Sequence, residues 1–182
     1  GHRAGRRYGT PALAERARHC RGCELWRHAT QIVFGAGPPG ARVVLVGEQP
    51  GDQEDIVGMP FVGPAGQLLD RALRDAGIDR HAVYVTNAVK HFKFEPRGKR
   101  RLHKTPTQQE ALACRVWLER ELDMVRPALI VALGATAARA LSGHDVPIQR
   151  NRGRILGADG QGDAALLITV HPSYLLRVPD AE

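Results

Sequence analysis

The sequence predicts an α/β fold in which helices cover both faces of a central, mainly parallel sheet of four strands. Three stretches are apolar almost without interruption, as strands buried on both faces are: residues 41–46, 128–133 and 165–170. A fourth strand is expected at residues 83–87, and helical segments separate the strands along the chain. Because strands that alternate with helices pair in parallel through crossover connections, a three-layer α/β/α architecture follows. The 182 residues suffice for one domain with a proper core, which we expect to span residues 1–182.

Four helices are predicted from their end signals and their apolar spacing, over residues 10–18, 63–76, 107–125 and 135–141. The longest opens with the capping-box pattern Thr107-x-x-Glu110, in which each side chain satisfies the other residue's backbone N–H. Its inward-facing side chains are expected to be Leu112, Val116, Leu122 and Val125. A further short strand, residues 154–156, leads into a Gly-rich turn around Asp159 and Gly160.

Unusual residues gather where the predicted strands end. Glu48 and Gln49 follow the first strand, Asn87 ends the second, Gly134 follows the third and His171 follows the last. In parallel sheets the ligand binds in the crevice beyond the carboxyl ends of the strands. The sequence therefore predicts one crevice lined by loops that are far apart in the chain.

Residues 90–106 form the most basic stretch of the chain and connect a strand to the longest helix. Pro96 and Gly98 interrupt it, so it is expected to be a loop rather than a packed element. A long connection between two well-defined elements is usually functional, and we interpret this one as a functional loop.

The net charge of +7 favours a polyanionic partner, with nucleic acid as the first choice. No stretch is long and apolar enough for a membrane span, and the basic, polar N-terminus lacks the apolar stretch of a signal peptide. Three cysteines, two of them in Cys20-x-x-Cys23, argue against a disulfide framework. They indicate a reducing, cytoplasmic compartment and a metal or cluster site.

Five motifs together resemble the uracil-DNA glycosylase superfamily. In chain order they are GEQPG (47–51), PFVGPAGQLLD (60–70), VTNAVK (85–90), LGATAA (133–138) and HPSYLLR (171–177). They look most like the iron–sulfur branch, family 4 and its relatives. The segment KRRLH (99–103) resembles the signature of the UdgX group, whose usual form has Ile where this chain has Leu102. The resemblance implies the glycosylase fold and a protein, taken to be a monomer, that acts on uracil-containing DNA, single strands included, in a bacterial-type cytoplasm.

The chemistry of uracil excision assigns roles to the residues of the crevice. The Asn87 amide can accept from uracil N3–H and donate to O4, whereas cytosine presents the opposite pattern. Phe61 can stack on the base. His171 is placed to donate a hydrogen bond to uracil O2 as negative charge develops there. The simpler interpretations are a strand-end cap, a core aromatic residue and a structural histidine.

The resemblance to the UdgX group implies that the protein becomes covalently attached to the abasic deoxyribose. His103 is the expected nucleophile, since a neutral imidazole can capture the cationic sugar before water does. Glu48 is expected to accept the other ring N–H of His103 and fix its tautomer. Gln49 lies in the stretch that positions water in ordinary glycosylases and is expected to take part in catalysis and to bind uracil. Two alternatives stay open: a turnover glycosylase in which His103 only contacts DNA, and a metal-stabilised DNA-binding module without glycosidic chemistry.

DNA contacts are expected from the loop at residues 171–177 and from the basic segment. The resemblance implies that a leucine of the first loop wedges into the minor groove while Arg177 contacts phosphate. Arg101 is expected either to contact DNA or to hold its loop shut through a carboxylate or carbonyl. The full predicted set is Lys99, Arg100, Arg101, Ser173, Leu175, Leu176 and Arg177.

The predicted metal ligands are Cys20, Cys23, His91 and Cys114. In the iron–sulfur branch a cysteine follows the NxVK segment, and His91 stands at that position here. The resemblance implies a [4Fe–4S] cluster with one imidazole ligand, and structural zinc is the alternative because Cys3His is also a zinc set. The chain ends soon after Arg177, which leaves open that further residues follow.

Overall fold

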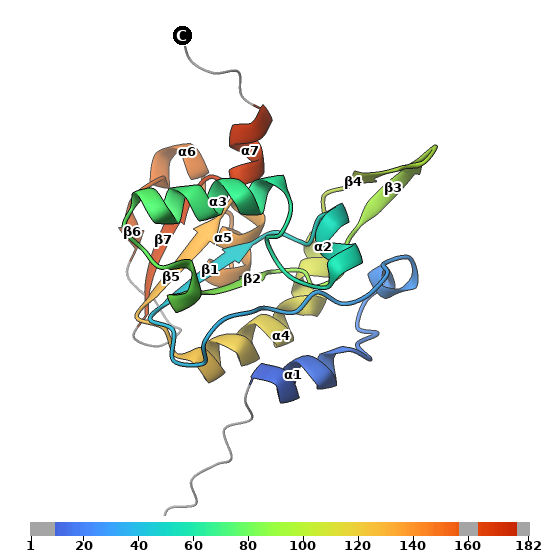
Figure 1. Cartoon of the computed structure of the whole chain (residues 1–182), viewed down its shortest axis with the longest axis horizontal. Helices are drawn as coiled ribbons and strands as arrows, with labels where there is room; N and C mark the ends of the chain where they lie inside the picture. The colour runs from blue at the N-terminus through green and yellow to red at the C-terminus, as the bar shows by residue number, and fades with distance from the viewer. Residues whose placement is uncertain (1–9, 157–163, 178–182) are drawn as a thin grey trace, which may run out of the picture.

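The structure is a computed structural model that describes residues 10–156 and 164–177. Its core is a five-stranded sheet in the order β2-β1-β5-β7-β6, seen in Figure 1. The strands are β1 (Val43–Gly47), β2 (Tyr84–Asn87), β5 (Leu129–Leu133), β6 (Ile155–Leu156) and β7 (Ala165–Thr169). The first four in spatial order are parallel, as expected. The predicted count of four is corrected to five, because the two-residue β6 pairs antiparallel with β7 at one edge.

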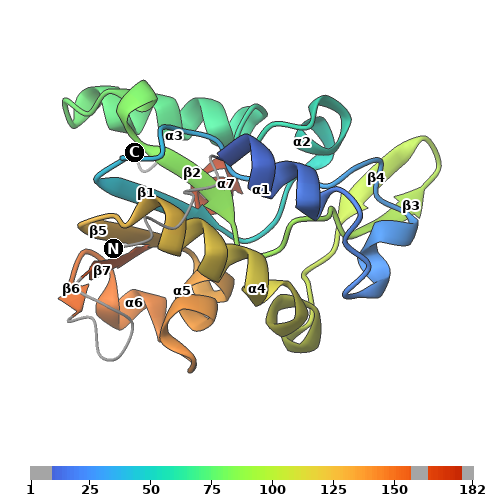
Figure 2. The same cartoon turned by 90° about the horizontal axis from the view of Figure 1, so that it is seen from below.

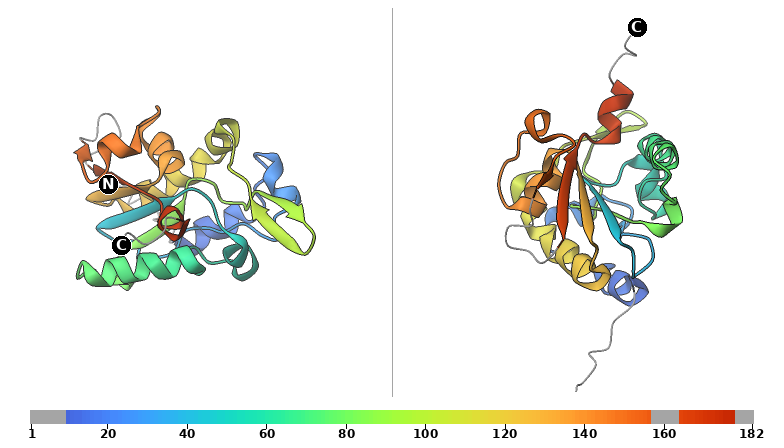
Figure 3. Two further views of the ribbon diagram at one scale, coloured as in Figure 1. Left: turned by 90° about the horizontal axis from the view of Figure 1, so that it is seen from above. Right: turned by 90° about the vertical axis from the view of Figure 1, so that its left-hand side faces the viewer.

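Helices lie on both faces of this sheet, which confirms the predicted three layers (Figure 2; Figure 3, right). One face carries α3 (Pro64–Asp75), and the other carries α4 (Gln108–Val125) and α5 (Ala135–Ser142), with α1 (Thr10–Ala17) against α4. Each side has its own apolar core. Leu45, Val85 and Val131 pack towards α3, while Val44, Val46 and Ala132 pack towards α4 and α5.

The predicted helices are present, but the inward face of α4 differs from the expectation. Thr107 and Glu110 form the capping box as predicted, and Val125 is buried. Leu112 and Val116, however, are 67% and 41% exposed, so their predicted burial is wrong. The helix instead turns Cys114, Trp117, Leu118 and Glu121 inward. Its inward face is polar in part, which an apolar periodicity cannot reveal.

The basic segment is a β-hairpin rather than an irregular loop. Its strands β3 (Phe94–Arg97) and β4 (Arg100–His103) pair antiparallel, and the hairpin projects from the body of the molecule next to α2 (Asp52–Val57) in Figure 1. Gly98 has φ +60° and is the first of two turn residues, as in a type II′ hairpin turn. Pro96 is tolerated because a two-stranded ribbon leaves one edge of each strand unpaired.

Four short helices complete the described chain: the 3-10 helices η1 (Glu24–Arg27) and η2 (Arg80–Ala82), α6 (Ile148–Asn151) and α7 (Pro172–Arg177). No helix within residues 10–156 and 164–177 is long and apolar enough to cross a membrane. The predicted turn around Asp159 and Gly160 lies outside the described residues.

Candidate active site

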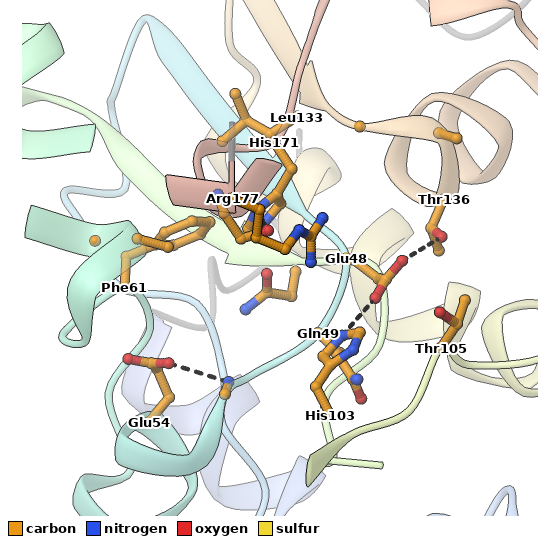
Figure 4. Close-up of a pocket in the computed structure, with 17 residues that line it drawn as sticks. Glu48, Gln49, Glu54, Phe61, His103, Thr105, Leu133, Thr136, His171 and Arg177 are labelled. Atoms are coloured by element: carbon orange, nitrogen blue, oxygen red, sulfur yellow. Dashed lines mark hydrogen bonds and ion pairs between the residues drawn. The ribbon is translucent and has the colours of Figure 1, made fainter. Parts of the chain in front are cut away.

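A pocket of about 380 Å³ opens at the carboxyl ends of the parallel strands, where the sequence predicted it (Figure 4). It brings together loops that follow β1, β2, β5 and β7 with the end of the hairpin. Eight of the predicted site residues line it: Glu48, Gln49, Phe61, Asn87, His103, His171, Ser173 and Arg177. Residues that the sequence interpretation did not single out also line it, among them Glu54, Thr105 and Thr136.

Gly47, the last residue of β1, allows the side chains of Asn87, Phe61 and His171 to converge. A Cβ atom at this position would lie 2.5 Å from Asn87 Oδ1, 2.7 Å from Phe61 Cζ and 3.2 Å from His171 Nε2. Any side chain here would therefore displace at least two of the three. The requirement for glycine follows from close approach, since the backbone of Gly47 has ordinary extended geometry within β1.

Asn87 lies at the end of β2 with only 2% of its surface exposed. Its Oδ1 atom is buried and has no hydrogen-bond partner among the described residues. A buried polar atom without a partner costs free energy, so such atoms are rare and usually belong to a binding site. The amide faces a pocket in which a ligand donor would satisfy Oδ1.

Phe61 forms one wall of the pocket in an unusual backbone conformation, with φ +55°. Its ring stacks near His171, with 6.0 Å between ring centroids and 25° between planes. The Glu54 carboxylate holds this turn by accepting hydrogen bonds from the backbone N–H groups of Val62 and Gly63. Gly66 is needed because a Cβ there would overlap the Phe61 carbonyl oxygen. The signal that could have revealed Glu54 is its place at the third position of the helix after Gly51.

His171 is held as a neutral donor. The backbone N–H of Ser173 donates to its Nδ1 at 3.1 Å, so the ring proton lies on Nε2, the atom near Gly47. Burial lowers the pKa of His171 to about 4. The nearby Glu48 carboxylate opposes this shift, while His103 and Arg177 act in the same direction as burial. Near neutral pH the pocket therefore presents an N–H donor without a positive charge.

The low pKa of His171 predicts a pH-dependent stability. The unfolded chain binds a proton at an ordinary histidine pKa of about 6.5, whereas the folded protein takes it up only near pH 4. Folding stability therefore falls as the pH drops from about 6.5 towards 4, and between pH 7 and 5 this residue alone accounts for about 2 kcal/mol. His171→Gln should lose that part of the slope in urea unfolding at the two pH values. Equal slopes in the variant and the parent would contradict the assignment.

Glu48 links the hairpin to the body of the pocket. Its Oε1 lies 2.9 Å from His103 Nε2, and its Oε2 accepts a hydrogen bond from the Thr136 hydroxyl at 2.8 Å (Figure 4). Burial alone would raise the pKa of Glu48, but the hydrogen bonds from His103 and Thr136 bring the pKa below its usual value. An ionised carboxylate only accepts, so the proton of a neutral His103 ring lies on Nε2. The predicted pairing of Glu48 with His103 is present, and Thr136 is an addition to it.

Gln49 belongs to the base of the hairpin. Its Nε2 donates to the carbonyl oxygens of Lys93 and Lys104, at 3.3 and 3.0 Å, and its Oε1 accepts from the Lys93 backbone N–H at 2.7 Å. Lys93 precedes β3 and Lys104 follows β4. The amide that the sequence interpretation offered to uracil or water is thus occupied, and Gln49 serves instead to fix the stem of the hairpin next to His103.

Arg101 holds the hairpin against α2 through two carboxylates. This is the second of the two roles that the sequence predicted for Arg101. Its Nε donates to Asp52 Oδ1 at 2.7 Å and its NH1 donates to Asp55 Oδ2 at 2.6 Å. The guanidinium also lies over the rings of Phe92 and Phe94, at 5.3 and 5.1 Å from their centroids. Asp55 is fully buried, so its charge depends on this partner. A DNA contact by Arg101 stays a prediction.

Arg101→Ala should release the hairpin and displace His103. Because a misplacement of about 1 Å in a reacting group can cost 10²-fold, reactions that depend on His103 should slow about 100-fold. Hydrogen–deuterium exchange of residues 94–103 should accelerate in the variant. Arg100→Ala is the matched control, since Arg100 is exposed on the same strand. Unchanged exchange in Arg101→Ala would show that Arg101 does not hold the hairpin.

The remaining predicted DNA contacts lie on the hairpin, on α7 and in the pocket. Lys99 and Arg100 are exposed on the hairpin, and Leu175 and Leu176 are 44% and 49% exposed on α7. Ser173 and Arg177 line the pocket itself, as noted above.

The side chains of the four predicted metal ligands are not arranged around a common point that could hold a metal ion. Among the described residues, no group of three or more His, Cys, Asp or Glu side chains is arranged to hold a metal ion. The three cysteines are nevertheless close enough for Cys20 to raise the pKa of Cys23 and for both to raise that of Cys114. Two N–H groups donate to their sulfurs: Trp117 Nε1 to Cys20 at 3.1 Å and the Lys90 backbone to Cys114 at 3.3 Å. His91 is buried, and burial lowers its pKa.

Comparison with known proteins places this geometry in a family. Residues 34–182 match the model of the uracil DNA glycosylase superfamily. The chain is 42% identical over 166 residues to a type-4 uracil-DNA glycosylase of Thermotoga maritima, covering 91% of this chain and 82% of that protein. It is 37% identical to a type-4 uracil-DNA glycosylase of Pyrobaculum aerophilum, covering 92% and 84%, and 36% identical to one of Archaeoglobus fulgidus, covering 88% and 79%. The chain belongs to the uracil-DNA glycosylase superfamily.

Proposed function

We propose that this protein removes uracil from DNA and that His103 then captures the abasic sugar, leaving the protein covalently attached. One observation carries the second half of this proposal. His103 lines the same pocket as Asn87 and His171, with its Nε2 2.9 Å from the carboxylate of Glu48. An imidazole and an adjacent acceptor within hydrogen-bond reach form the usual arrangement of an activated nucleophile.

Recognition would begin with a uracil turned out of the stack, or presented by a single strand, into the pocket. Asn87 Oδ1 would accept the uracil N3–H, and its amide would donate to O4. This contact would supply the partner that Oδ1 does not find among the described residues. Phe61 would stack on the base and His171 Nε2–H would point to O2.

Cleavage would break the bond between uracil N1 and the sugar C1′, with the electron pair leaving on the base. The negative charge spreads onto O2, where the neutral His171 donor can stabilise it. A neutral donor stabilises the departing anion without holding it as an ion pair. Water is displaced from this region because the recognition groups are largely buried.

Capture would form a bond between C1′ of the cationic sugar and His103 Nδ1, the ring nitrogen whose lone pair is free while Nε2–H donates to Glu48. Glu48 would take the Nε2 proton as that bond forms, and Thr136 would keep the carboxylate oriented. The departed uracil anion takes up a proton from solvent, which balances the reaction. No base remains in the adduct to activate a water against the new C–N bond.

A turnover glycosylase is the second candidate, and its support is the similarity to type-4 uracil-DNA glycosylases. In that case the hairpin would swing aside and Glu48 would position a water in place of His103. His103 would then only contact DNA. A DNA-binding module without glycosidic chemistry would leave the unpartnered Asn87 amide without a use.

A denaturing gel separates these candidates. The protein is mixed with single-stranded DNA that carries one uracil, and a matched oligonucleotide with thymine is the control. A band of lower mobility that survives heat and detergent, at one protein per DNA, supports capture. Repeated release of uracil without that band would favour the turnover enzyme, and equal binding of both oligonucleotides without cleavage would favour the binding module.

We propose that Cys20, Cys23, Cys114 and His91 together hold an iron–sulfur cluster, [4Fe–4S], with zinc as the alternative. The chemistry of the donors supports it, since neighbouring thiolates that receive N–H donors suit such a cluster. The cluster would fasten the segment after α1 to α4 and to the start of the hairpin, a structural role. Iron, sulfide and zinc analysis of the purified protein decides between the two.

A further inference from the structure

A second polar cluster lies behind the pocket, wholly inside the protein. Its members are Tyr84, Thr86, Lys90 and Glu121, each with no exposed surface. The proposed reaction uses none of these groups. Lys90 follows β2, and Glu121 is the polar residue on the inward face of α4.

Every donor of the Lys90 ammonium has a partner. Lys90 Nζ donates to Thr86 Oγ1 at 2.5 Å, to the Asn87 carbonyl oxygen at 2.6 Å and to Glu121 Oε1. Glu121 is equally occupied, since it also accepts from the Thr86 hydroxyl, the Tyr84 hydroxyl and the Gly35 backbone N–H. The cluster is therefore satisfied throughout, as a buried polar network has to be if it is to define one structure.

Stability alone is a poor reason for this pair. Removing two charges from water costs several kcal/mol for each ion in a typical protein, about as much as their attraction returns. Apolar residues of similar volume are often as stable or more so. A buried ion pair is better explained by the positions of the groups that it fixes. Here Lys90 also binds the carbonyl oxygen of Asn87, the residue proposed to recognise uracil.

That contact holds the main chain of Asn87, whose side chain has little else to orient it. The Asn87 side chain makes no hydrogen bond to any residue within the described ranges, and its Oδ1 is unpartnered. Its direction therefore depends on where its backbone is placed. On one side Ala88 N–H donates to the Gly47 carbonyl at 2.8 Å, and on the other Lys90 binds the Asn87 carbonyl.

We infer that Lys90, held in place by Glu121, is a positioning residue that fixes Asn87 for recognition of uracil. The inference rests on the proposed function, in which Asn87 Oδ1 accepts the uracil N3–H. Lys90 does not touch the base. It acts by clamping the peptide group that follows Asn87, and Glu121 of α4 supplies the counter-charge.

The variant Lys90→Met with Glu121→Gln removes this contact. The introduced glutamine can accept from Gly35 and Tyr84 and donate to Thr86, and no charge is left buried. The Asn87 carbonyl then loses its donor, and the Thr86 hydroxyl loses the acceptor that Glu121 provided. Tyr84→Phe is the matched control, because it removes a hydrogen bond from the same cluster and leaves the Lys90 contact with Asn87 intact. A second variant, Lys90→Met with Glu121→Leu, replaces both charged residues of the pair with apolar residues.

The readout is the ratio of inhibition constants of free uracil and 3-methyluracil against single-turnover excision. 3-Methyluracil lacks the N3–H, so the ratio reports on the Asn87 contact, whereas general loosening weakens both inhibitors alike. We expect parent and Tyr84→Phe to prefer uracil by about 10-fold or more, as one good hydrogen bond to a buried group allows. In both double variants the preference should shrink to about twofold or less.

Three outcomes would overturn the inference. A double variant that is folded, by its thermal unfolding, and keeps the parent's ratio would show that Asn87 does not depend on Lys90. Unfolding of both double variants would show that the pair serves the core as a whole. A parent protein that neither excises uracil nor is inhibited by it would contradict the proposed function itself. An unchanged ratio in an active variant would contradict only the role of Lys90.

Discussion

His103→Ser should abolish the covalent adduct with uracil-containing DNA and turn the protein into an enzyme that releases uracil repeatedly. Serine lacks the imidazole that is proposed to capture the sugar, and its smaller volume opens a space beside Glu48 Oε1, which loses its partner at 2.9 Å. A water in that space would be oriented by a carboxylate that Thr136 still holds. The base-recognition residues are unaffected, so cleavage of the glycosidic bond should continue.

The measurement is a denaturing gel together with a count of uracil released per protein. Glu95→Ser is the control, since Glu95 is exposed on the facing strand of the same hairpin and does not line the pocket. In the double variant His103→Ser with Glu48→Gln both adduct and turnover should be lost, because an amide is a weak base for water. An undiminished adduct in His103→Ser would show that another group reacts with the sugar.

The position of His103 depends on structure that the sequence did not reveal. Pro96 and Gly98 disfavour one continuous strand through residues 90–106, and so the segment was predicted to be a loop. In a hairpin the same residues are compatible with pairing, because Gly98 adopts the positive φ of the turn and Pro96 lies in a two-stranded ribbon. A rigid ribbon carries His103 to the pocket with better-defined geometry than a loop would.

The parallel strands and the crevice were predictable because they depend on local signals. Continuous apolar stretches mark buried strands, and the topology then brings the strand ends together without any further information. Glu48, Asn87 and His171 could be assigned to one site for this reason. The structure adds the requirement for glycine at position 47. No sequence pattern shows this requirement, because it arises from side chains of three other segments that approach Gly47.

Side chains whose role is set by a distant partner were the ones missed or misassigned. Gln49 was expected to act on uracil or water, but the backbone of Lys93 and Lys104 occupies its amide. Glu121 was passed over because an apolar periodicity treats a carboxylate as a solvent-facing residue. Its burial follows from Lys90, which is distant in sequence and forms an ion pair with it. Pairings of this kind follow from the fold and cannot be read from spacing.

Asn87→Asp should lower the rate of uracil excision by about 10³-fold, and adduct formation should fall with it, because no sugar cation forms before the base leaves. The ionised carboxylate of this variant could still accept the N3–H of uracil, but it could not donate to O4. It would also place a negative charge beside a base that becomes negative as the bond breaks. Both effects act on the transition state, so single-turnover excision should slow even at saturating DNA.

Cytosine gives the matched test of the same contact, since its exocyclic amino group is a donor that a carboxylate can accept. Selectivity for uracil over cytosine in otherwise identical oligonucleotides should therefore collapse in Asn87→Asp, while in Asn87→Ala excision of both bases should be weak. Thermal unfolding of each variant establishes that the core around Gly47 is intact. Full retention of uracil selectivity in Asn87→Asp would show that the unpartnered Oδ1 atom at the end of β2 is not where the base is recognised, and the role of Lys90 behind it would lose its basis.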